Sequence, residues 1–376
     1  MGELFEKIKV NSLKYKTSEI PSIPKDEFIL PALTAGIQNQ GLNNYVPKDN
    51  ATILKNVITI SANGANTGAT FFQNKEFTVL QDAYAIKWVY TDDVLTDNNY
   101  LFLASAISKR IYGNYEWTNK AGWERIKSEK IHLPTQNGQI DFAFMENFIA
   151  ELEAERIAEL EAYLKVTGLR DYILTEEERA VLEAFRSGKI SWGGVKTLNN
   201  QQVANIEWKM FNLEKLFGKS TRGRRLKSAD RVGGNLPFVT AGEANEGISA
   251  YIGNDVHIFS ENTTTIDMFG SAKYRNYKYG GDDHIAVVHT ENLAKHAAIF
   301  VTTAIHKVSH AGQFSYSRNF YATDADELTI SLPATNGVPA YAYMEVFIKA
   351  VQKLVIKEVV EYADRKIEAT REVVKK

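Results

Sequence analysis

The chain has 376 residues, of which 44% are hydrophobic and 24% charged, with a formal net charge of −2 and no cysteine. These values indicate two ordinary globular domains, and the missing cysteines exclude disulfide scaffolds, thiolate zinc sites and a cysteine nucleophile. No apolar run approaches the roughly 20 residues that cross a bilayer. The first residues show no signal-peptide pattern, so we expect a cytoplasmic protein without a membrane segment.

The elements expected along the chain follow one order twice. Runs of β-branched and aromatic residues, separated by Asn, Gly, Asp and Thr, predict strands, and runs with apolar residues every three or four positions predict helices. The expected strands include residues 53–60, 77–86, 256–259 and 284–288, and the expected helices include residues 100–110 and 297–307. Each half therefore reads as an α+β domain with a twisted sheet and a few helices.

Two sequence blocks occur once in each half. Residues 30–46 (LPALTAGIQNQGLNNYV) and 236–252 (LPFVTAGEANEGISAYI) share eight of 17 positions, and residues 131–149 and 330–348 share ten of 19. This repeat indicates a tandem duplication of one domain, in which the ends of each copy are kept and the middle has drifted. Divergent middles on a common frame suit a protein whose halves recognise different targets.

A long amphipathic helix is expected after each copy of the second block. Apolar residues recur there at spacings of three and four, and the first copy keeps this register until Arg156. The residues expected to pack are Met145, Ile149, Leu152, Leu160, Met344, Ile348, Val351, Val355 and Val359. Two such stripes can cover each other as an antiparallel coiled coil that separates two pseudo-symmetric domains; the alternative is that each helix caps its own domain.

Residues 170–208 have no counterpart after the second copy. Thr175 and Glu178 form the pattern of a capping box, which predicts a helix start, and residues 187–194 are rich in Gly and Ser, as in a turn. Charge is segregated around this insert, because residues 146–185 carry eleven acidic and four basic side chains. We interpret the insert as a small helical linker with a surface for docking.

The motifs of catalytic sites are incomplete. Residues 217–220 (FGKS) resemble the end of a P-loop, but Glu214 stands where that loop requires glycine. His306 and His310 are spaced to present two metal ligands on one helix face, but the first copy has Ser108 at the position of His306. We therefore expect neither a catalytic site nor a metal site in this chain.

Both divergent middles are instead rich in side chains that read nucleic acid. Amide and guanidinium groups make the paired hydrogen bonds that distinguish bases in the major groove, and Lys and Arg contact phosphates; the competing interpretation is that Asn and Gln are ordinary turn residues. The candidate DNA-binding residues are Gln38, Asn39, Asn63, Asn66, Thr67, Gln73, Lys75 and Lys120 in the first copy, and Arg222, Arg224, Arg225, Lys273, Tyr274, Arg275, Lys278, Gln313, Tyr316 and Arg318 in the second.

The arrangement resembles the specificity subunit of type I restriction-modification systems, and equally the specificity chain of type IIB-like systems. The likeness rests on the duplicated topology and on the two junctions, residues 131–149 and 330–348. In that family each of two target-recognition domains reads one half of a bipartite site in double-stranded DNA. The resemblance implies target-recognition domains at residues 1–144 and 206–343 and helical spacers at residues 145–205 and 344–376.

The resemblance also implies partners. The specificity chain is not itself an enzyme and is expected to hold no cofactor. It recruits DNA methyltransferase subunits, which methylate adenine with S-adenosylmethionine, and in restriction complexes a nuclease-translocase that uses Mg²⁺ and ATP. The alternative from another class is a two-lobed enzyme that binds a sugar or a nucleotide between its lobes. Salt-dependent binding to duplex DNA, without turnover by the lone chain, separates the two.

Overall fold

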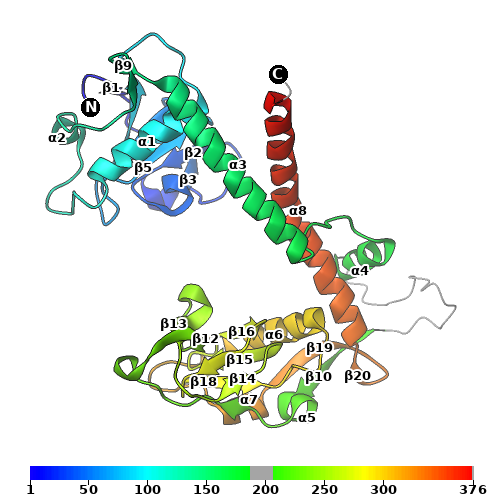
Figure 1. Ribbon diagram of the computed structural model, residues 1–376. Helices are drawn as coiled ribbons and strands as arrows, with labels where there is room; N and C mark the ends of the chain where they lie inside the picture. Colours follow the sequence, from blue (N-terminus) through cyan, green and yellow to red (C-terminus); the bar gives the residue numbers. More distant parts are fainter. Residues whose placement is uncertain (187–205, 375–376) are drawn as a thin grey trace. The chain divides into compact units, whose positions relative to one another are not determined.

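The computed structural model describes residues 1–186 and 206–374, so the turn-rich stretch expected at 187–194 lies outside the described residues. The chain divides into two units, Met1–Leu160 with Ile367–Lys376, and Glu161–Lys366. Each unit holds one α+β domain and part of each long helix (Figure 1). We call residues 1–141 domain 1 and residues 206–340 domain 2.

Domain 1 contains two sheets and the helix that covers the larger one. The larger sheet has the order β1-β7-β4-β5 and the smaller has the order β3-β2-β6. Helix α1 lies against β4 and β5, and its side chains Leu103 and Ile107 are fully buried with Ile58 and Ile86. The elements are β1 (Phe5–Lys7), η1 (Thr17–Glu19), β2 (Leu30–Leu33), β3 (Leu42–Val46), β4 (Val57–Ser61), β5 (Thr70–Gln73), β6 (Thr78–Val79), β7 (Ala83–Trp88), α1 (Asp97–Ile111) and α2 (Trp123–Ile126).

Domain 2 repeats this topology. Its two sheets have the orders β11-β18-β15-β16 and β13-β12-β17-β14, and α6 lies against β15 and β16. The pairs β2–β6 and β12–β17 are both parallel, so the copies share even this detail and the predicted duplication is confirmed. The elements are β11 (Thr221–Arg222), η3 (Ser228–Asp230), β12 (Gly233–Val239), β13 (Ile248–Ile252), β14 (Ile258–Phe259), β15 (Thr263–Asp267), β16 (Ala272–Arg275), β17 (Tyr279–Gly281), β18 (Ile285–Val288), α6 (Lys295–Ser309) and α7 (Ala322–Glu327).

Part of the difference in length between the copies lies in one hairpin. β4 begins at Val57 and β15 at Thr263, 206 residues later, whereas β5 begins at Thr70 and β16 at Ala272, only 202 residues later. The connection between β4 and β5 is therefore four residues longer than the one between β15 and β16. This longer hairpin contains the glycine-rich stretch 64–68.

A β-hairpin precedes each long helix. These elements are β8 (Thr135–Gln136), β9 (Gln139–Ile140) and α3 (Phe142–Val166) in the first copy, and β19 (Thr329–Thr335), β20 (Val338–Pro339) and α8 (Tyr341–Val374) in the second. Domain 2 additionally has β10 (Glu207–Asn212), paired antiparallel with β19, and α5 (Leu213–Phe217). The helices start three residues before the expected spacer boundaries at 145 and 344. Met145 and Met344 are buried in the cores of their own domains, so the first turn of each helix caps its domain.

The packing stripe expected along α8 is partly wrong. Val355 is 73% exposed and Val359 39% exposed, whereas Val360 and Ala363 are fully buried. The buried face is thus displaced by one residue. Beside it, Asp364 accepts hydrogen bonds from the guanidinium of Arg170, which is distant in the sequence; one of them is 3.1 Å long. In the first copy Leu152 is exposed, while Ile149 and Leu164 are buried. Leu160, Ile348 and Val351 are half-buried.

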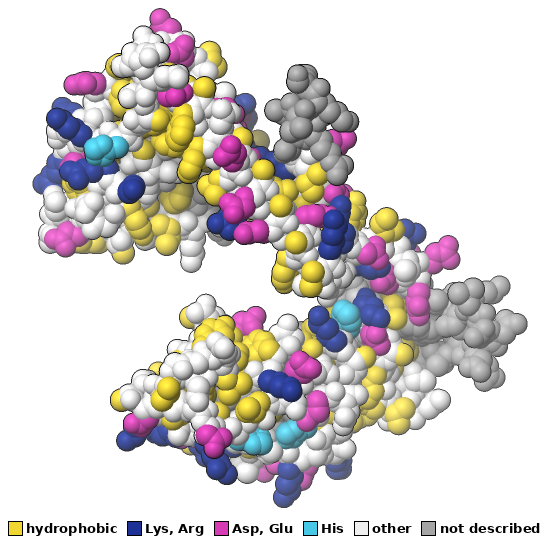
Figure 2. Space-filling model, in the orientation of Figure 1, with side chains coloured by type: hydrophobic (Ala, Val, Ile, Leu, Met, Phe, Trp, Pro, Cys, Tyr) yellow, Lys and Arg dark blue, Asp and Glu magenta, His cyan; other side chains and the backbone are white. Residues whose placement is uncertain are grey.

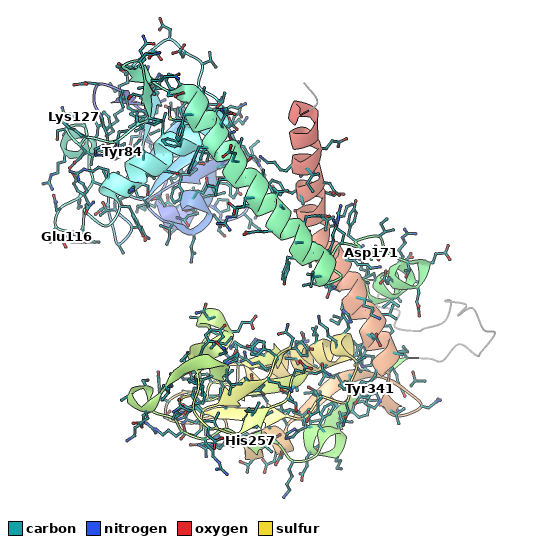
Figure 3. All side chains as sticks on the ribbon, viewed as in Figure 1. Tyr84, Glu116, Lys127, Asp171, His257 and Tyr341 are labelled. Atoms are coloured by element: carbon teal, nitrogen blue, oxygen red, sulfur yellow. The ribbon has the colours of Figure 1, made fainter. Side chains whose placement is uncertain are left out.

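The first part of the insert is a helix that packs on α8. In α4 (Glu176–Arg186) the expected capping box forms, because Glu178 N donates to Thr175 Oγ1 at 3.2 Å and Thr175 N donates to Glu178 Oε2 at 2.8 Å. Lys353 Nζ on α8 lies 3.1 Å from Glu178 Oε2 and 2.9 Å from Asp171 Oδ2. Figure 3 labels Asp171 beside α8. This ion-pair network fixes the insert to the helix that follows domain 2.

Candidate nucleic-acid interface

A strained loop occurs at the same place in both domains. In η2 (Gln38–Gly41) the residues Asn39 and Gln40 have φ of 46° and 55°, and in η4 (Ala244–Gly247) Asn245 and Glu246 have φ of 48° and 55°. Side chains rarely adopt this left-handed region, which costs about 1–2 kcal/mol per residue. Strain that survives in both copies is typical of a functional loop held in place by its surroundings.

The residue that ends each loop must be glycine. Gly41 and Gly247 have φ of 88° and 82°, and a Cβ on either would lie 2.6 Å from the carbonyl oxygen of Thr34 or Thr240. The same threonines donate their backbone N–H to the glycine carbonyls, at 2.9 and 2.8 Å. The retained sequence Thr-Ala-Gly, followed by Asn-x-Gly, therefore encodes one closed loop.

Each loop is anchored to the end of a central strand by a matching contact. Gly36 N donates to Ser61 Oγ at 3.2 Å in domain 1, and Gly242 N donates to Asp267 Oδ2 at 3.3 Å in domain 2. Ser61 and Asp267 were not among the expected site residues. The separation of 206 residues between the copies of the first block, which β4 and β15 keep, is the signal that could have found them.

Polar side chains of domain 1 gather around η2. Gln73 Nε2 donates to the carbonyl of Gln40 at 3.4 Å and to Thr59 Oγ1 at 3.2 Å. Asn63 Nδ2, on the long hairpin, donates to Asp82 Oδ1 at 3.0 Å. The structure thus brings the candidate Gln73 beside η2, where Gln38 and Asn39 are exposed.

The corresponding surface of domain 2 has a different chemistry. Lys273 Nζ lies 3.2 Å from Glu243 Oε1, just before η4, and 2.8 Å from Ser271 Oγ. Hydrogen bonds from Ser271 and Lys273 hold the pKa of Glu243 below its usual value, so this carboxylate is charged at neutral pH. The exposed ring of Tyr316 lies edge-on to Phe269, 5.1 Å between centroids, in the turn that follows β15.

Two of the expected DNA-binding residues are wrong. Thr67 is 2% exposed and its Oγ1 accepts the backbone N–H of Ala121, so it joins the long hairpin to the core. Arg275 is 1% exposed, donates to Thr265 Oγ1 at 2.9 Å and lies over the ring of Tyr279. A buried charge needs such partners, and neither side chain can reach DNA.

The remaining candidate DNA-binding side chains differ in whether they are free to contact DNA. Three of them are held by partners within the domain: Tyr274 by Asn262, Arg318 by Asp324, and Arg222 by the carbonyl of Asp283. Gln313 is exposed but accepts from Ala311 N and donates to the Val308 carbonyl. Lys120 lies over the Trp117 ring. Lys75, Lys120, Arg224, Arg225 and Lys278 are also exposed, and Asn66 is half-buried.

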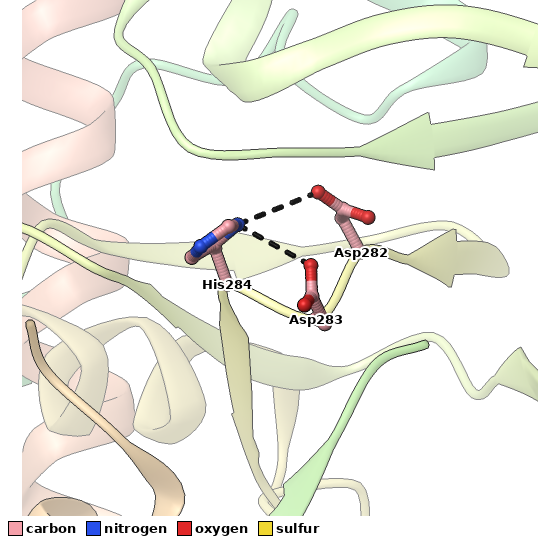
Figure 4. Close-up of side chains that lie close together, drawn as sticks. All are labelled: Asp282, Asp283 and His284. Carbon is pink, nitrogen blue, oxygen red and sulfur yellow. Dashed lines mark ion pairs between the residues drawn. The ribbon is translucent and has the colours of Figure 1, made fainter. Parts of the chain in front are cut away.

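Among the described residues, one cluster has the composition of a metal site, at Asp282, Asp283 and His284 (Figure 4). His284 Nδ1 lies 3.3 Å from Asp283 Oδ1 and 3.7 Å from Asp282 Oδ2, as in an ion pair. Asp282 Oδ1 also accepts the backbone N–H of Leu226 at 3.3 Å. These contacts hold the basic run of residues 219–227 against the domain, which is a sufficient role for the acidic pair.

The histidine pair on α6 also has a structural role. His306 Nδ1 accepts the backbone N–H of Ala272 at 3.1 Å, and His310 Nδ1 lies 3.1 Å from the carbonyl of Phe269. Burial, with the neighbouring His310, lowers the pKa of His306. Both rings thus fix the β15–β16 turn beside η4.

We expect Gly41→Ala to destabilise domain 1 by about 2–4 kcal/mol, since the substitution adds a clash with Thr34 to the cost of a positive φ. Gly64→Ala is the matched control, because Gly64 also has a positive φ, of 80°, but open space around it; its cost should stay near 1 kcal/mol. Urea unfolding measures both. Equal costs would show that the closed loop is not needed for stability.

Comparison with known proteins identifies the family. The family model described as the type I restriction modification DNA specificity domain matches residues 1–162 and 205–362. The chain belongs to this family. The specificity subunit S.BcgI of a type II restriction enzyme from Heyndrickxia coagulans is 22% identical over 266 residues, which cover 69% of each chain.

A solved specificity subunit has the same fold. The crystal structure of the S subunit of a type I restriction-modification system from M. genitalium is similar over 99% of this chain and 92% of that one, with 17% identity and a TM-score of 0.58. The present chain is therefore a specificity subunit of the restriction-modification class, as its duplicated junctions predicted. Nothing in these comparisons supports the two-lobed sugar or nucleotide enzyme. No helix among the described residues is both long enough and apolar enough to span a bilayer.

Proposed function

We propose that each domain of this specificity subunit reads one half of a bipartite site in double-stranded DNA, with η2 and η4 at the two reading surfaces. The observation that carries this is the same strained loop, anchored by the same contact, with different side chains around it. In domain 1 the neighbours are amides such as Gln73; in domain 2 they are Lys273 and Glu243. Amides favour adenine and a lysine favours guanine, so the halves are expected to differ in sequence.

The long helices take the role of a spacer in this proposal. α3 runs without interruption from Phe142 to Val166, and α8 from Tyr341 to Val374. Leu164, Val360 and Ala363 are buried, and the pair Arg170–Asp364 joins the segment after α3 to α8. These contacts support a helix pair that fixes the gap between the half-sites, as an antiparallel coiled coil would.

The catalytic work would belong to other chains. We propose that the subunit recruits DNA methyltransferase subunits, which bind S-adenosylmethionine and methylate adenine, and in a restriction complex a nuclease-translocase that uses Mg²⁺ and ATP. Fluorescence anisotropy with labelled duplex DNA tests the first step. Binding should weaken as salt rises from roughly 50 to 200 mM, because bound cations are released from the phosphates. Affinity that does not change with salt would contradict DNA recognition by this chain.

Replacing Arg224 and Arg225 together by Ala should weaken binding to every sequence alike. Both side chains are exposed, and the backbone N–H of Arg224 donates to the Gly281 carbonyl at 2.9 Å, so the run is held in place for phosphate contacts. The salt slope should fall by about two, one per lost phosphate contact. Arg156→Ala is the control, because Arg156 is paired with Glu159 on α3. A changed base preference would show instead that the run reads bases.

A further inference from the structure

The surface between α1 and α3 in domain 1 has a counterpart between α6 and α8 in domain 2. Each carries three aromatic side chains at matching positions: Phe102, Phe144 and Phe148 in domain 1, and Phe300, Tyr343 and Phe347 in domain 2. The ring centroids of Phe102 and Phe148 lie 5.8 Å apart, as do those of Phe300 and Phe347. The duplication has therefore kept one aromatic surface in both domains.

In domain 2 the chain covers this surface with α4. Val181 of α4 is fully buried in one cluster with Tyr343 and Phe347. The ring of Phe185, one turn further along α4, lies 4.8 Å from the ring of Phe347. As a result Tyr343 is only 4% exposed. The covering helix presents an apolar face, and its other side chains include Glu176, Glu177 and Glu183.

Strand β10 covers the rest of the surface in domain 2. It pairs antiparallel with β19 over six residues, from Glu207 opposite Ala334 to Asn212 opposite Thr329. The ring of Trp208 stacks on Phe300, 6.3 Å between centroids. An extended segment thus adds a strand to the edge of the domain and places one aromatic side chain on α6.

In domain 1 the same surface is open. Phe144 is 50% and Phe148 48% exposed, and Figure 2 shows hydrophobic side chains gathered over α1 and the start of α3. A groove of about 990 Å³ runs between α1, residues 128–132 and α3. The backbone of residues 130–134 matches the part of β19 that binds β10, but within the described residues it has no strand partner.

Matching backbone contacts place the groove. The amino group of Met1 donates to the carbonyl of Glu129 at 2.6 Å, and the N–H of Leu213, the residue after β10, donates to the matching carbonyl of Leu328 at 3.0 Å. The groove in domain 1 therefore lies where β10 lies in domain 2.

The rim of the open groove is basic. It includes Lys109, Arg110, Lys130 and His132, with Glu129 paired to Arg110. The matching positions in domain 2 are Lys307, Val308, Thr329 and Ser331, so three of the four are neutral where the chain covers itself. The open copy is therefore the more basic of the two, which indicates an occupant with acidic side chains.

We propose that this groove is the docking site for a partner polypeptide with the chemistry of α4 and β10. The partner contributes an acidic amphipathic helix to Phe144 and Phe148, and an extended segment that pairs along residues 130–134 and sets an aromatic ring on Phe102. The inference rests on the proposed function only in taking this partner to be another subunit of the restriction-modification complex. Buried aromatic side chains of this kind dominate the energy of such interfaces.

A labelled synthetic peptide with the sequence of residues 173–212 is the probe, titrated with the full chain. We expect it to bind, and the double variant Phe144→Ala, Phe148→Ala to bind at least about tenfold more weakly. Ser105→Trp, which fills the groove from α1 and leaves both phenylalanines in place, should have the same effect. Tyr163→Ala removes an exposed aromatic side chain elsewhere on α3 and should leave binding unchanged.

Three results would overturn the proposal. The first is a peptide that fails to bind at roughly 100 μM, an affinity weaker than about −5 kcal/mol, or that binds the groove variants as well as the unaltered chain. The second is loss of duplex DNA affinity in these variants, which would assign the groove to DNA. The third is a dimer, seen by sedimentation, that the variants abolish, which would assign it to a second copy. Failed peptide binding with intact DNA binding leaves the proposed function standing.

Discussion

Exchanging residues 34–130 for those of a relative with a known target should change one half of the methylated DNA site and leave the other half intact. This segment spans η2, its anchor Ser61 and the polar side chains around them. Each base pair lost from a half-site costs about 1–3 kcal/mol, so a half of three base pairs suffices to abolish methylation at the original site. Sequencing of methylated adenines, with the partner methyltransferase present, measures the outcome.

The matched exchange in domain 2 replaces residues 240–329. It should change the other half-site, because η4 and Asp267 are held within that segment. If either exchange altered both halves, the domains would not read DNA independently. If neither exchange altered the site, the surfaces around η2 and η4 would not be the reading surfaces.

Inserting four residues after Leu152 should abolish methylation at the original spacing. α3 is continuous through this position, so the insertion adds about 6 Å and a rotation of about 40° between domain 1 and the buried Leu164. DNA rises about 3.4 Å per base pair, and a half-site displaced and rotated by these amounts is out of register. Site mapping should return either a new gap or no site.

An equal insertion at Gly138 is the control, since this glycine lies in the turn of the β8–β9 hairpin with open space around it. It should leave the gap unchanged. A helical insertion after Val359 should not be tolerated, because it displaces the buried Val360 and Ala363 and separates Asp364 from Arg170. An unchanged gap after the Leu152 insertion would mean that the helices do not set the spacing.

The order of strands and helices could be predicted because the two repeated blocks mark the same elements in both copies. The repeated blocks correspond to loops and helix starts. At positions such as Gly41 and Gly247, the backbone geometry permits only glycine. The strands and helices expected between them are present with small shifts in their ends. The capping box at Thr175 could also be predicted, because it depends on two residues only three positions apart.

The rest depended on contacts between residues far apart in the chain. Thr67 and Arg275 have the composition of a reading surface, and only the positions of Ala121 and Thr265 show that they are buried. The buried face of α8 is displaced by one residue from the expected stripe, and the contact between Asp364 beside it and Arg170 in the insert cannot be read from the sequence of α8. Nothing local in the sequence of β10 shows that it completes the sheet of β19 and covers Phe300.

Mapping of methylated adenines in DNA exposed to this subunit with its methyltransferase tests the central claim most directly. Two recognition domains with different side chains around matching loops predict a split site: two short, unlike sequences separated by a fixed number of unspecified base pairs. A continuous recognition sequence, or halves separated by a variable gap, would contradict the account.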